Sequence, residues 1–363
     1  MVKLHPYRIS RMLMILTCIA VLLSLSFTGA AAQDELEDPI LNAAREAGLI
    51  TEIGETQTHD EVTITLDWAY ADTQRIVLGY TLQPVKAINR DDWAMSMTSA
   101  SLKDDQQASF SYAGGYSKDG KQPDQLVVVI EYYTQAIIPV EGSQDFTVNN
   151  DYFNPPPDKI NLTFDPKLTP VGAQSALPFA FHFAVPLYKP VVIKETQSIK
   201  IKGVTMTLEQ VSVTPTRTVA RICYTMPDSR DWQLESTVEL NGMTSGIAGA
   251  ALVGGKEAAS DTQNRCRDIS YNVYYDVKQP TSINVTVDHI ATSMGEGPDD
   301  WNKIKAELAK RNIQIEVISV PHALDVKVLN VPEGIDYDQA VLDARESLGD
   351  LVKGPWKFAV DLP

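Results

Sequence analysis

The chain has 363 residues, of which 44% are hydrophobic and 21% are charged. This length exceeds what one ordinary core needs, and the composition excludes a disordered or fibrous protein, so we expect two or three globular domains. The formal net charge of −16 makes nucleic acid and anionic lipid poor partners. The sequence therefore predicts a globular protein that does not bind nucleic acid.

The N-terminus has the pattern of a secretory signal peptide. Basic residues precede an apolar run from Met12 to Phe27, and small residues follow at Ala30 and Ala32. The run is shorter than the roughly 20 residues that a membrane-spanning helix needs, so we expect cleavage after Ala32. Residues 1–32 are thus predicted to be a signal peptide, and the mature protein to be secreted or extracytoplasmic. Retention of residues 12–27 would instead tether the protein to the membrane.

Two cysteines, Cys223 and Cys266, remain after such processing. An even pair in an oxidising compartment predicts a disulfide, with two free buried thiols as the alternative. Because the spacing is not Cys-x-x-Cys, we expect a structural bond and not a redox centre.

A leader at residues 33–60 contains one helix signal. Asp38 is a good N-cap, Pro39 suits the first helical position, and Gly48 suits the residue after the helix. A short helix is predicted between them.

Alternating apolar residues then predict antiparallel strands. Residues 62–70 place their apolar side chains on one face, as do residues 76–82, with a turn at 71–73. Later strands are expected at 93–102, 125–133 and 160–164, and turns at 113–115 and 154–157.

The most informative feature is an internal repeat. Val62–Asp67 recurs as Val204–Glu209, and Arg75 recurs as Arg217 at the same offset. Three further matches follow in the same order: Tyr80–Leu82 with Tyr224–Met226, Arg90–Trp93 with Arg230–Trp232, and Ile160–Asp165 with Ile283–Asp288. Colinear order predicts two domains of one fold, at residues 61–170 and 171–363, with Trp93 and Trp232 in their cores. The fold class is predicted to be mainly β. The spacing of the strands favours two tandem immunoglobulin-like antiparallel β-sandwiches over barrels.

The C-terminal part departs from the strand pattern. Helical spacing is found at 299–311 and at 336–351, where Asp336 suits an N-cap, with a strand between them at 313–320. Alternation returns over 356–362. We therefore expect a small α+β insertion at about residues 295–353, after which the last strand rejoins the second domain.

The residues do not form a recognisable catalytic, cofactor or metal motif. The five histidines are scattered, and the segment Gly249–Lys256 resembles a phosphate loop with the wrong spacing, so it is predicted to be a flexible loop. No Gly-x-Ser-x-Gly elbow is present. The sequence predicts no enzyme, no cofactor and no metal. Carboxylate pairs of the glycosidase kind come together only in space, so a secreted hydrolase stays open as an alternative.

Segments in both halves of the chain resemble a known bacterial family. Leu41–Leu49, Val62–Leu66 and Arg75–Tyr80 resemble a domain of unknown function that commonly forms the outer portion of membrane-bound anti-sigma factors. The segments Phe179–Leu187, Val204–Leu208 and Gly354–Phe358 are similar to the immunoglobulin-like domain that often accompanies it.

The resemblance implies an extracytoplasmic sensing or protein-interaction module, with no catalytic residues to carry over. An anti-sigma factor needs a cytoplasmic sigma-binding segment before its membrane helix, and only eleven residues precede the apolar run here. Our leading hypothesis is thus a non-catalytic exported module that binds an unknown ligand or protein and cannot itself hold a sigma factor. A structural or adhesive cell-envelope protein is the alternative from another class.

Overall fold

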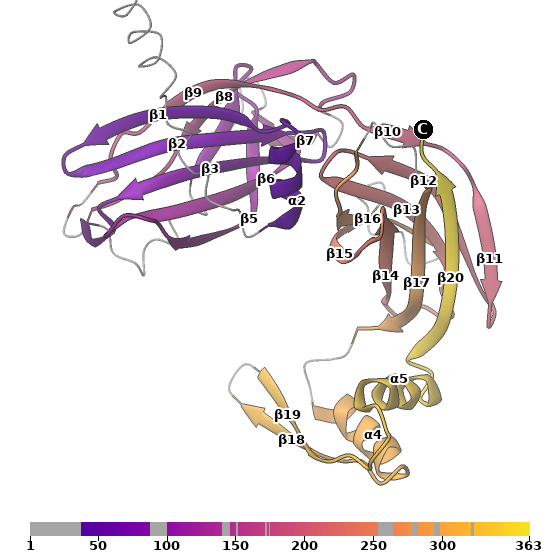
Figure 1. The fold of residues 1–363 in the computed structure, drawn as a ribbon. Helices are drawn as coiled ribbons and strands as arrows, with labels where there is room; N and C mark the ends of the chain where they lie inside the picture. The colour runs from indigo at the N-terminus through magenta and orange to yellow at the C-terminus, as the bar shows by residue number, and fades with distance from the viewer. Residues whose placement is uncertain are drawn as a thin grey trace, which may run out of the picture. The chain divides into compact units, whose positions relative to one another are not determined.

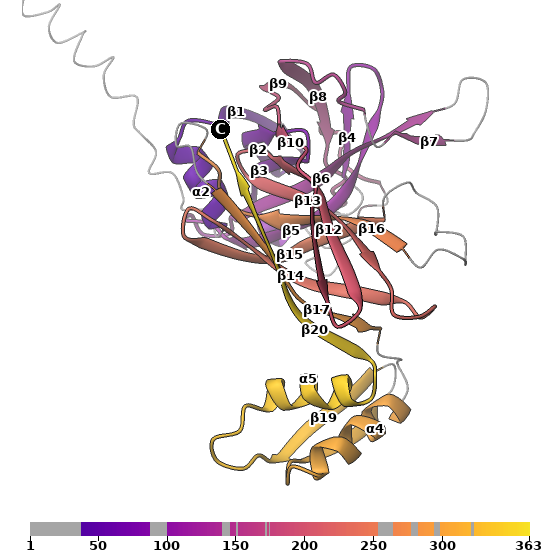
Figure 2. The same cartoon turned by 90° about the vertical axis from the view of Figure 1, so that its right-hand side faces the viewer.

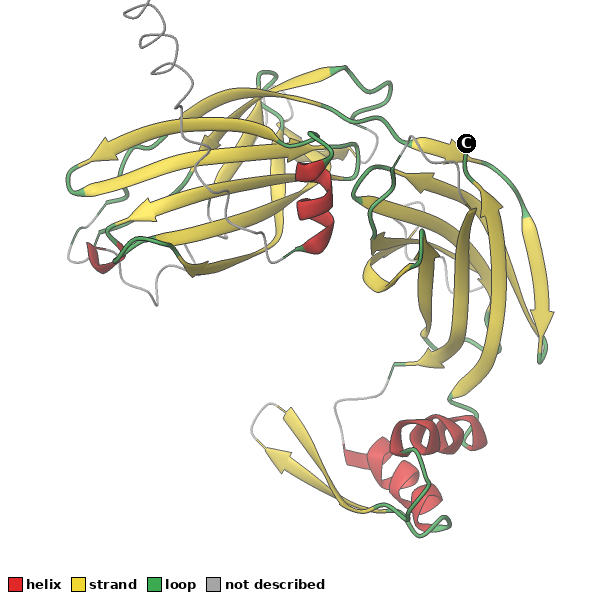
Figure 3. Cartoon of the chain, in the orientation of Figure 1, coloured by secondary structure: helices red, strands yellow, loops and turns green. Residues whose placement is uncertain are grey.

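The fold is mainly β, with two large antiparallel sheets and a few short helices (Figures 1 and 3). The computed structural model describes residues 38–87, 100–139, 146–149, 152–170, 173, 175–252, 264–276, 282–293, 298–320 and 323–363. Residues 43–363 form one compact unit. The predicted signal peptide lies outside the described residues, and no helix in the described part is long and apolar enough to cross a membrane.

The predicted helix of the leader is present as α2 (Pro39–Glu46). The carboxylate of Asp38 accepts hydrogen bonds from the backbone of Ile40 at 2.8 Å and of Leu41 at 3.3 Å, which caps the first turn. At the other end, Gly48 adopts a φ of +73°, and the next amide returns to the carbonyl of Ala44. Glycine permits this left-handed stop.

The first sheet curls into a nearly closed barrel. Its strands are β1 (Thr51–His59), β2 (Val62–Ala71), β3 (Arg75–Gln83), β4 (Ser101–Asp104), β5 (Ser109–Asp119), β6 (Leu126–Pro139), β7 (Phe146–Asn149), β8 (Lys159–Asp165) and β9 (Phe181–Pro186). They pair in the order β1-β2-β3-β6-β5-β4-β8-β9, with β7 on β6. The two ends approach where the Gln57 amide donates to the Ala180 carbonyl at 2.6 Å. Apolar side chains such as Ile64, Leu78 and Phe164 fill the interior.

The second sheet forms a half-barrel. Its strands are β10 (Val191–Ile193), β11 (Gln197–Ile201), β12 (Val204–Val213), β13 (Arg217–Thr225), β14 (Trp232–Leu240), β15 (Met243–Leu252), β16 (Asn264–Asn272), β17 (Ser282–Thr292) and β20 (Leu351–Asp361). The order is β10-β12-β13-β16-β15-β14-β17-β20, with β11 also on β12. Strand β15 pairs with β14 through residues 243–246 and with β16 through residues 247–252. This change of partner bends the sheet around its core.

The two strand orders correspond along the repeat. Strands β2, β3, β6, β5, β4 and β8 take the same places as β12, β13, β16, β15, β14 and β17. Each sheet also has a bulge at the equivalent residue, Asp67 between β2 and β3, and Glu209 between β12 and β13.

The register corrects one of the repeat matches. Tyr80 lies opposite Leu66, and Ile222 lies opposite Leu208, so Tyr80 corresponds to Ile222 and not to Tyr224. A slip of two residues keeps side chains on the same face, so the apolar pattern could not detect it. The predicted match at Arg90–Trp93 lies outside the described residues, whereas Trp232 lies in the second core as expected.

The bulge at Asp67 corrects the predicted face of β2. Ala69 and Ala71 face the core, whereas Trp68 and Tyr70 lie on the other side of the sheet. One extra residue in a strand moves every later side chain to the opposite face. Trp68 is still buried, with the Arg45 guanidinium over its ring at 5.1 Å.

Two predicted loops are strand. Residues 113–115 lie inside β5 beside a bulge, and Gly115 is needed there because an added Cβ would lie 2.5 Å from the carbonyl oxygen of Val129. Residues 249–252 of the expected flexible loop belong to β15, and the rest of that loop lies outside the described residues. Glycine within a strand marked a close backbone approach and not a turn.

The α+β insertion is present between β17 and β20 (Figure 2). It comprises α4 (Pro298–Ala309), β18 (Gln314–Val320), β19 (Ala323–Asn330) and α5 (Tyr337–Ser347) around its own small core. Asp336 caps α5 as predicted, by accepting from the Gln339 amide at 3.0 Å. Strand β19 was not predicted. Because β17 pairs directly with β20, the insertion interrupts a pair of neighbouring strands.

A buried polar cluster joins the first sheet to the second. Arg75 is fully buried, and it donates to the Thr216 hydroxyl at 2.9 Å and to Glu131 at 3.2 Å. Thr216 in turn donates to Asp72 at 3.0 Å, and Arg217 donates to Glu131 at 2.5 Å. Buried charges need such partners, so the cluster stabilises the junction only as a complete set.

Candidate functional site

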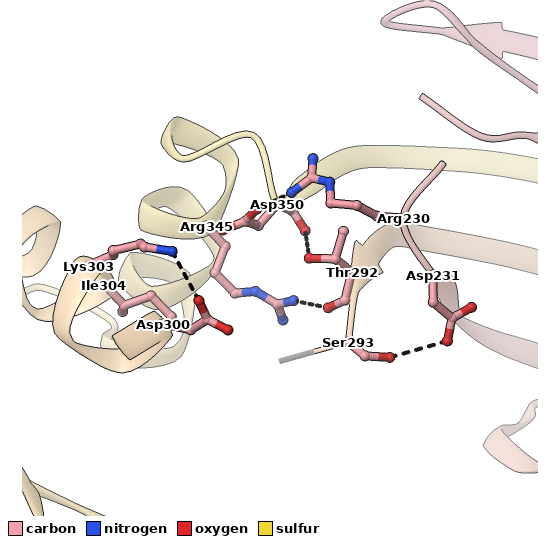
Figure 4. A pocket seen from close by; sticks show the side chains of 9 residues that line it. All are labelled: Arg230, Asp231, Thr292, Ser293, Asp300, Lys303, Ile304, Arg345 and Asp350. Atoms are coloured by element: carbon pink, nitrogen blue, oxygen red, sulfur yellow. Dashed lines mark hydrogen bonds and ion pairs between the residues drawn. The ribbon is translucent and has the colours of Figure 1, made fainter. Parts of the chain in front are cut away.

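A pocket lies where the α+β insertion meets the ends of β14, β17 and β20 (Figure 4). Its volume is about 360 Å³, within the range of small-ligand sites. The residues that line it are Arg230, Asp231, Thr292, Ser293, Asp300, Lys303, Ile304, Arg345 and Asp350. Charged side chains thus outnumber apolar ones, which suits a polar ligand.

Strand pairing brings these residues together. Trp232, the first residue of β14, is the register partner of Thr292 at the end of β17, so Arg230 and Asp231 lie beside that end. The Thr292 amide also donates to the carbonyl of Asp350 just before β20, at 3.0 Å. The two helices of the insertion, α4 and α5, then supply the opposite wall.

Arg230 is held in place by acids and a carbonyl. It donates to Asp350 at 2.5 Å, to Asp228 at 2.8 Å and to the Gly349 carbonyl at 2.7 Å, while its guanidinium stacks over Trp232 at 5.1 Å. The pKa of Asp228 is held well below its usual range, mainly by its hydrogen bonds from Arg230. These contacts therefore hold Arg230 in place at the edge of the pocket.

The other acids of the pocket also have cationic partners. Asp231 accepts from Arg265, and that hydrogen bond lowers its pKa. Asp300 accepts from Lys303 of the same helix at 3.1 Å. Both carboxylates face positive charge already, so neither attracts a further cation strongly.

Arg345 differs from its neighbours. Its Nη2 donates to the Thr292 carbonyl at 2.6 Å, but its buried Nε has no hydrogen-bond partner. Within the described residues, no carboxylate oxygen lies within 4.0 Å of its guanidinium. Burial lowers the pKa of Arg345, an effect that Asp350 and Asp300 oppose from a distance. A partly desolvated guanidinium without a paired carboxylate has the chemistry to accept an anion.

A second hollow, of about 790 Å³, is a weaker candidate. Its lining residues are Thr73, Thr134, Phe153, Asn154, Pro156, Pro190, Val192, Lys194, Gln210 and Arg221. Arg221 is neutralised by Asp268 through two hydrogen bonds of 2.8 Å, and Lys194 is exposed. Neither cation is both desolvated and unneutralised, in contrast to Arg345.

The site residues predicted from sequence lie elsewhere. Cys223 and Cys266 form the predicted disulfide, between β13 and β16 and away from the pocket lining. Of the histidines, His59, His182 and His289 are on different strands, and the other two lie outside the described residues. The repeat match includes Arg230 and Asp231 of the pocket, but nothing in the sequence marks Arg345 as different from any other arginine.

One cluster of metal-binding residue types is present in the described part of the chain. It consists of Glu209, Cys223 and Cys266, whose ligand atoms all lie within 4.8 Å of one another. The two cysteines were predicted to form a structural disulfide, with two free buried thiols as the alternative, and Glu209 was not connected with them. Strand pairing brings Glu209 of β12 close to both cysteines.

Comparisons with known proteins give no function. No family model matches the chain, and no curated protein does. A solved structure, "The crystal structure of the conserved domain protein from Bacillus anthracis", matches with a TM-score of 0.43 and 11% identity, over 87% of this chain and 92% of that one. At this level the similarity carries no argument about activity or ligand.

Proposed function

We propose that this protein is a non-catalytic, exported binding module whose ligand carries a carboxylate and occupies the pocket at Arg345. The observation that carries the proposal is the partly buried guanidinium of Arg345, which lines the pocket without a paired acid. A ligand carboxylate would supply the charged partner that this guanidinium lacks.

The ion pairs around the pocket support a ligand with a single negative charge. Among the three cations of the lining, Arg230 pairs with Asp350 and Asp228, and Lys303 pairs with Asp300, while Asp231 pairs with Arg265 from outside the lining. Arg345 is the lining cation that has no acid within ion-pair distance in the described part of the chain. The volume of about 360 Å³ admits an amino acid or the C-terminal residues of a short peptide.

Binding is better supported here than hydrolysis. A glycosidase needs one carboxyl group with a raised pKa to act as the acid. In the pocket, Asp231, Asp300 and Asp350 each accept a hydrogen bond from a cation, and the pKa of Asp231 is lowered. Such carboxylates hold cationic side chains in position, which fits the non-catalytic hypothesis.

Location and family are part of the same proposal. The signal-peptide pattern at residues 1–32 supports export, and the resemblance of Leu41–Leu49 and Val62–Leu66 supports kinship with anti-sigma-factor ectodomains. We also infer that each curled sheet is a variant of the immunoglobulin-like sandwich, in which a strand such as β15 passes from one half to the other. A carboxylate-bearing ligand outside the membrane would then be the signal.

Isothermal titration of the mature chain with acetate, glycine and a dipeptide tests the proposal. We expect binding that is weakened roughly tenfold or more in Arg345→Gln, because a hydrogen-bonded charge is removed. Arg311→Gln is the matched control, since Arg311 lies in the same insertion and pairs with Asp343 outside the pocket lining. Equal binding by both variants, or no binding of any probe by the wild type, would refute the site.

A further inference from the structure

The disulfide lies on the outer face of the second sheet. Cys223 and Cys266 are direct register partners on β13 and β16, with Cα atoms 4.0 Å apart. The flanking residues Ile222 and Tyr224 point into the core, so the sulfur atoms point outward, and both cysteines are partly exposed. The bond is therefore accessible to a reductant in the folded protein.

Reduction would leave the two sulfur atoms close together. Nine register pairs hold β13 against β16 from Arg217 to Thr225, and Cys223 and Cys266 supply only one of them. The other eight pairs and the core beneath them form without the sulfur–sulfur bond, so we expect the ladder to persist after reduction. The folded dithiol is thus a preformed pair of soft ligands.

A bulge aims a carboxylate at the same place. Glu209 is the extra residue of β12 in its pairing with β13, and its carboxylate lies within 4.8 Å of both sulfur atoms. Bulges re-aim side chains in this manner. Glu209 is exposed, so its carboxylate is free to adjust its position around a bound ion.

The equivalent bulge in the first domain directs its acidic side chain in the same way. There the equivalent bulge residue, Asp67, accepts a hydrogen bond of 2.6 Å from Thr81, and Thr81 occupies the position of Cys223. The residue paired with Thr81 on β6 is Val127, in the place of Cys266. Both bulge acids therefore reach the neighbouring strand, but only the second domain presents two sulfur atoms to the acid.

We propose that Glu209, Cys223 and Cys266 form a redox-gated site for a soft divalent cation such as Zn²⁺ or Cd²⁺. A dithiol reductant supplies two electrons and two protons to the disulfide and becomes a disulfide itself, which leaves two thiols. The cation then displaces the two thiol protons and binds both thiolates and the carboxylate, with water as a fourth ligand. The oxidised protein has no thiolate to offer and does not bind the ion.

Cadmium titration of the mature chain tests this site directly. The protein is reduced with dithiothreitol, desalted under argon and titrated with Cd²⁺ alone, while ultraviolet absorbance follows the thiolate-to-metal charge transfer. We expect one equivalent of Cd²⁺ to bind to the reduced chain and none to bind to the oxidised chain. Far-ultraviolet circular dichroism should show that the reduced chain stays folded.

Variants test whether Cys223, Cys266 and Glu209 themselves bind the metal ion. The double variant Cys223→Ser/Cys266→Ser should lose the absorbance, and Glu209→Gln should weaken binding roughly tenfold or more, as loss of a metal-site residue does. Glu239→Gln is the control, because Glu239 is another exposed glutamate of the same domain. The proposal is overturned if reduction unfolds the chain, if the reduced chain gives no charge-transfer band, or if Glu209→Gln binds as tightly as Glu239→Gln.

Discussion

Arg75 and Arg217 donate hydrogen bonds to opposite oxygens of one carboxylate, that of Glu131. The two arginines hold equivalent positions in the repeat, at the start of β3 and of β13. Arg75 is fully buried and Arg217 is 7% exposed, so this carboxylate compensates two desolvated charges at once. Duplicated residues thus converge on one residue that is not duplicated, and their interaction links the two sheets.

Glu131→Gln should destabilise the protein strongly. The substitution leaves two buried guanidinium groups without their shared carboxylate, and breaking a buried ion pair in this way costs roughly 3 kcal/mol or more. Urea unfolding of the mature chain measures the loss, with the exposed Glu61→Gln as a control expected to change little. If both variants unfold at the same urea concentration, the shared carboxylate is not a stabilising link.

Gly79→Ala should also be destabilising, for a steric reason. A Cβ at Gly79 would lie 2.1 Å from the ring of Trp68, a residue that is only 4% exposed. Overpacking of this kind costs about 1–3 kcal/mol. Gly114→Ala on β5 is the matched control, because nothing lies within 4 Å of its added Cβ. A wild-type unfolding midpoint for Gly79→Ala would show that the indole moves easily.

His289 should make the protein less stable in mild acid. Burial lowers the pKa of His289 from 6.5, and Arg345 and Lys353 lower it further, whereas Glu235 and Asp288 raise it. The unfolded chain therefore takes up this proton near pH 6.5, and the folded chain takes it up only at a lower pH. This contribution to stability is present above pH 6.5 and is lost as the pH falls toward the folded pKa.

Urea midpoints between about pH 7 and pH 5 measure this loss, and His289→Gln should flatten the dependence. The proposed ligand adds a second readout. A carboxylate on Arg345 would offset the positive charge that disfavours protonation of His289, so saturating ligand should raise the pKa of His289 in an NMR titration. An unchanged pKa at saturation would mean that the ligand binds away from Arg345.

Removal of the disulfide should lower stability without changing the fold. The bond closes a loop with a sequence separation of 43, and the chain-entropy model gives a stabilisation of about 4 kcal/mol for a loop of that size. Guanidinium unfolding of Cys223→Ala/Cys266→Ala against the oxidised wild type measures this contribution. A difference below about 1 kcal/mol would mean that the unfolded chain is already constrained in this region.

Sequence patterns predicted where helices and strands lie better than they predicted which side of the sheet each side chain faces. Alternation located β2, β3 and β8, and capping residues located α2 and α5, because these signals act over a few neighbouring residues. The bulge at Asp67 was not predicted, and it moves Trp68 and Tyr70 off the core face. A bulge depends on the partner strand, which a local pattern does not contain.

The candidate site could not be predicted from the sequence, for a related reason. Arg230 and Arg345 are far apart in the chain, and they meet because β14 and β20 both pair with β17. Arg345 has no paired carboxylate because the nearby aspartates pair with other cations in the folded structure. This depends on the positions of all these side chains, so no sequence motif predicts it.

The direct pairing of β17 with β20 has a consequence for the pocket. His289 and Ala291 are matched with Lys353 and Leu351, so the two ends of the insertion leave the sheet side by side, as the two strands of an ordinary hairpin do. A tight turn in place of residues 294–349 would preserve the hairpin, but it would delete Asp300, Lys303, Ile304 and Arg345 from the pocket. The pocket therefore depends on the insertion, whereas the sheet that carries the insertion does not.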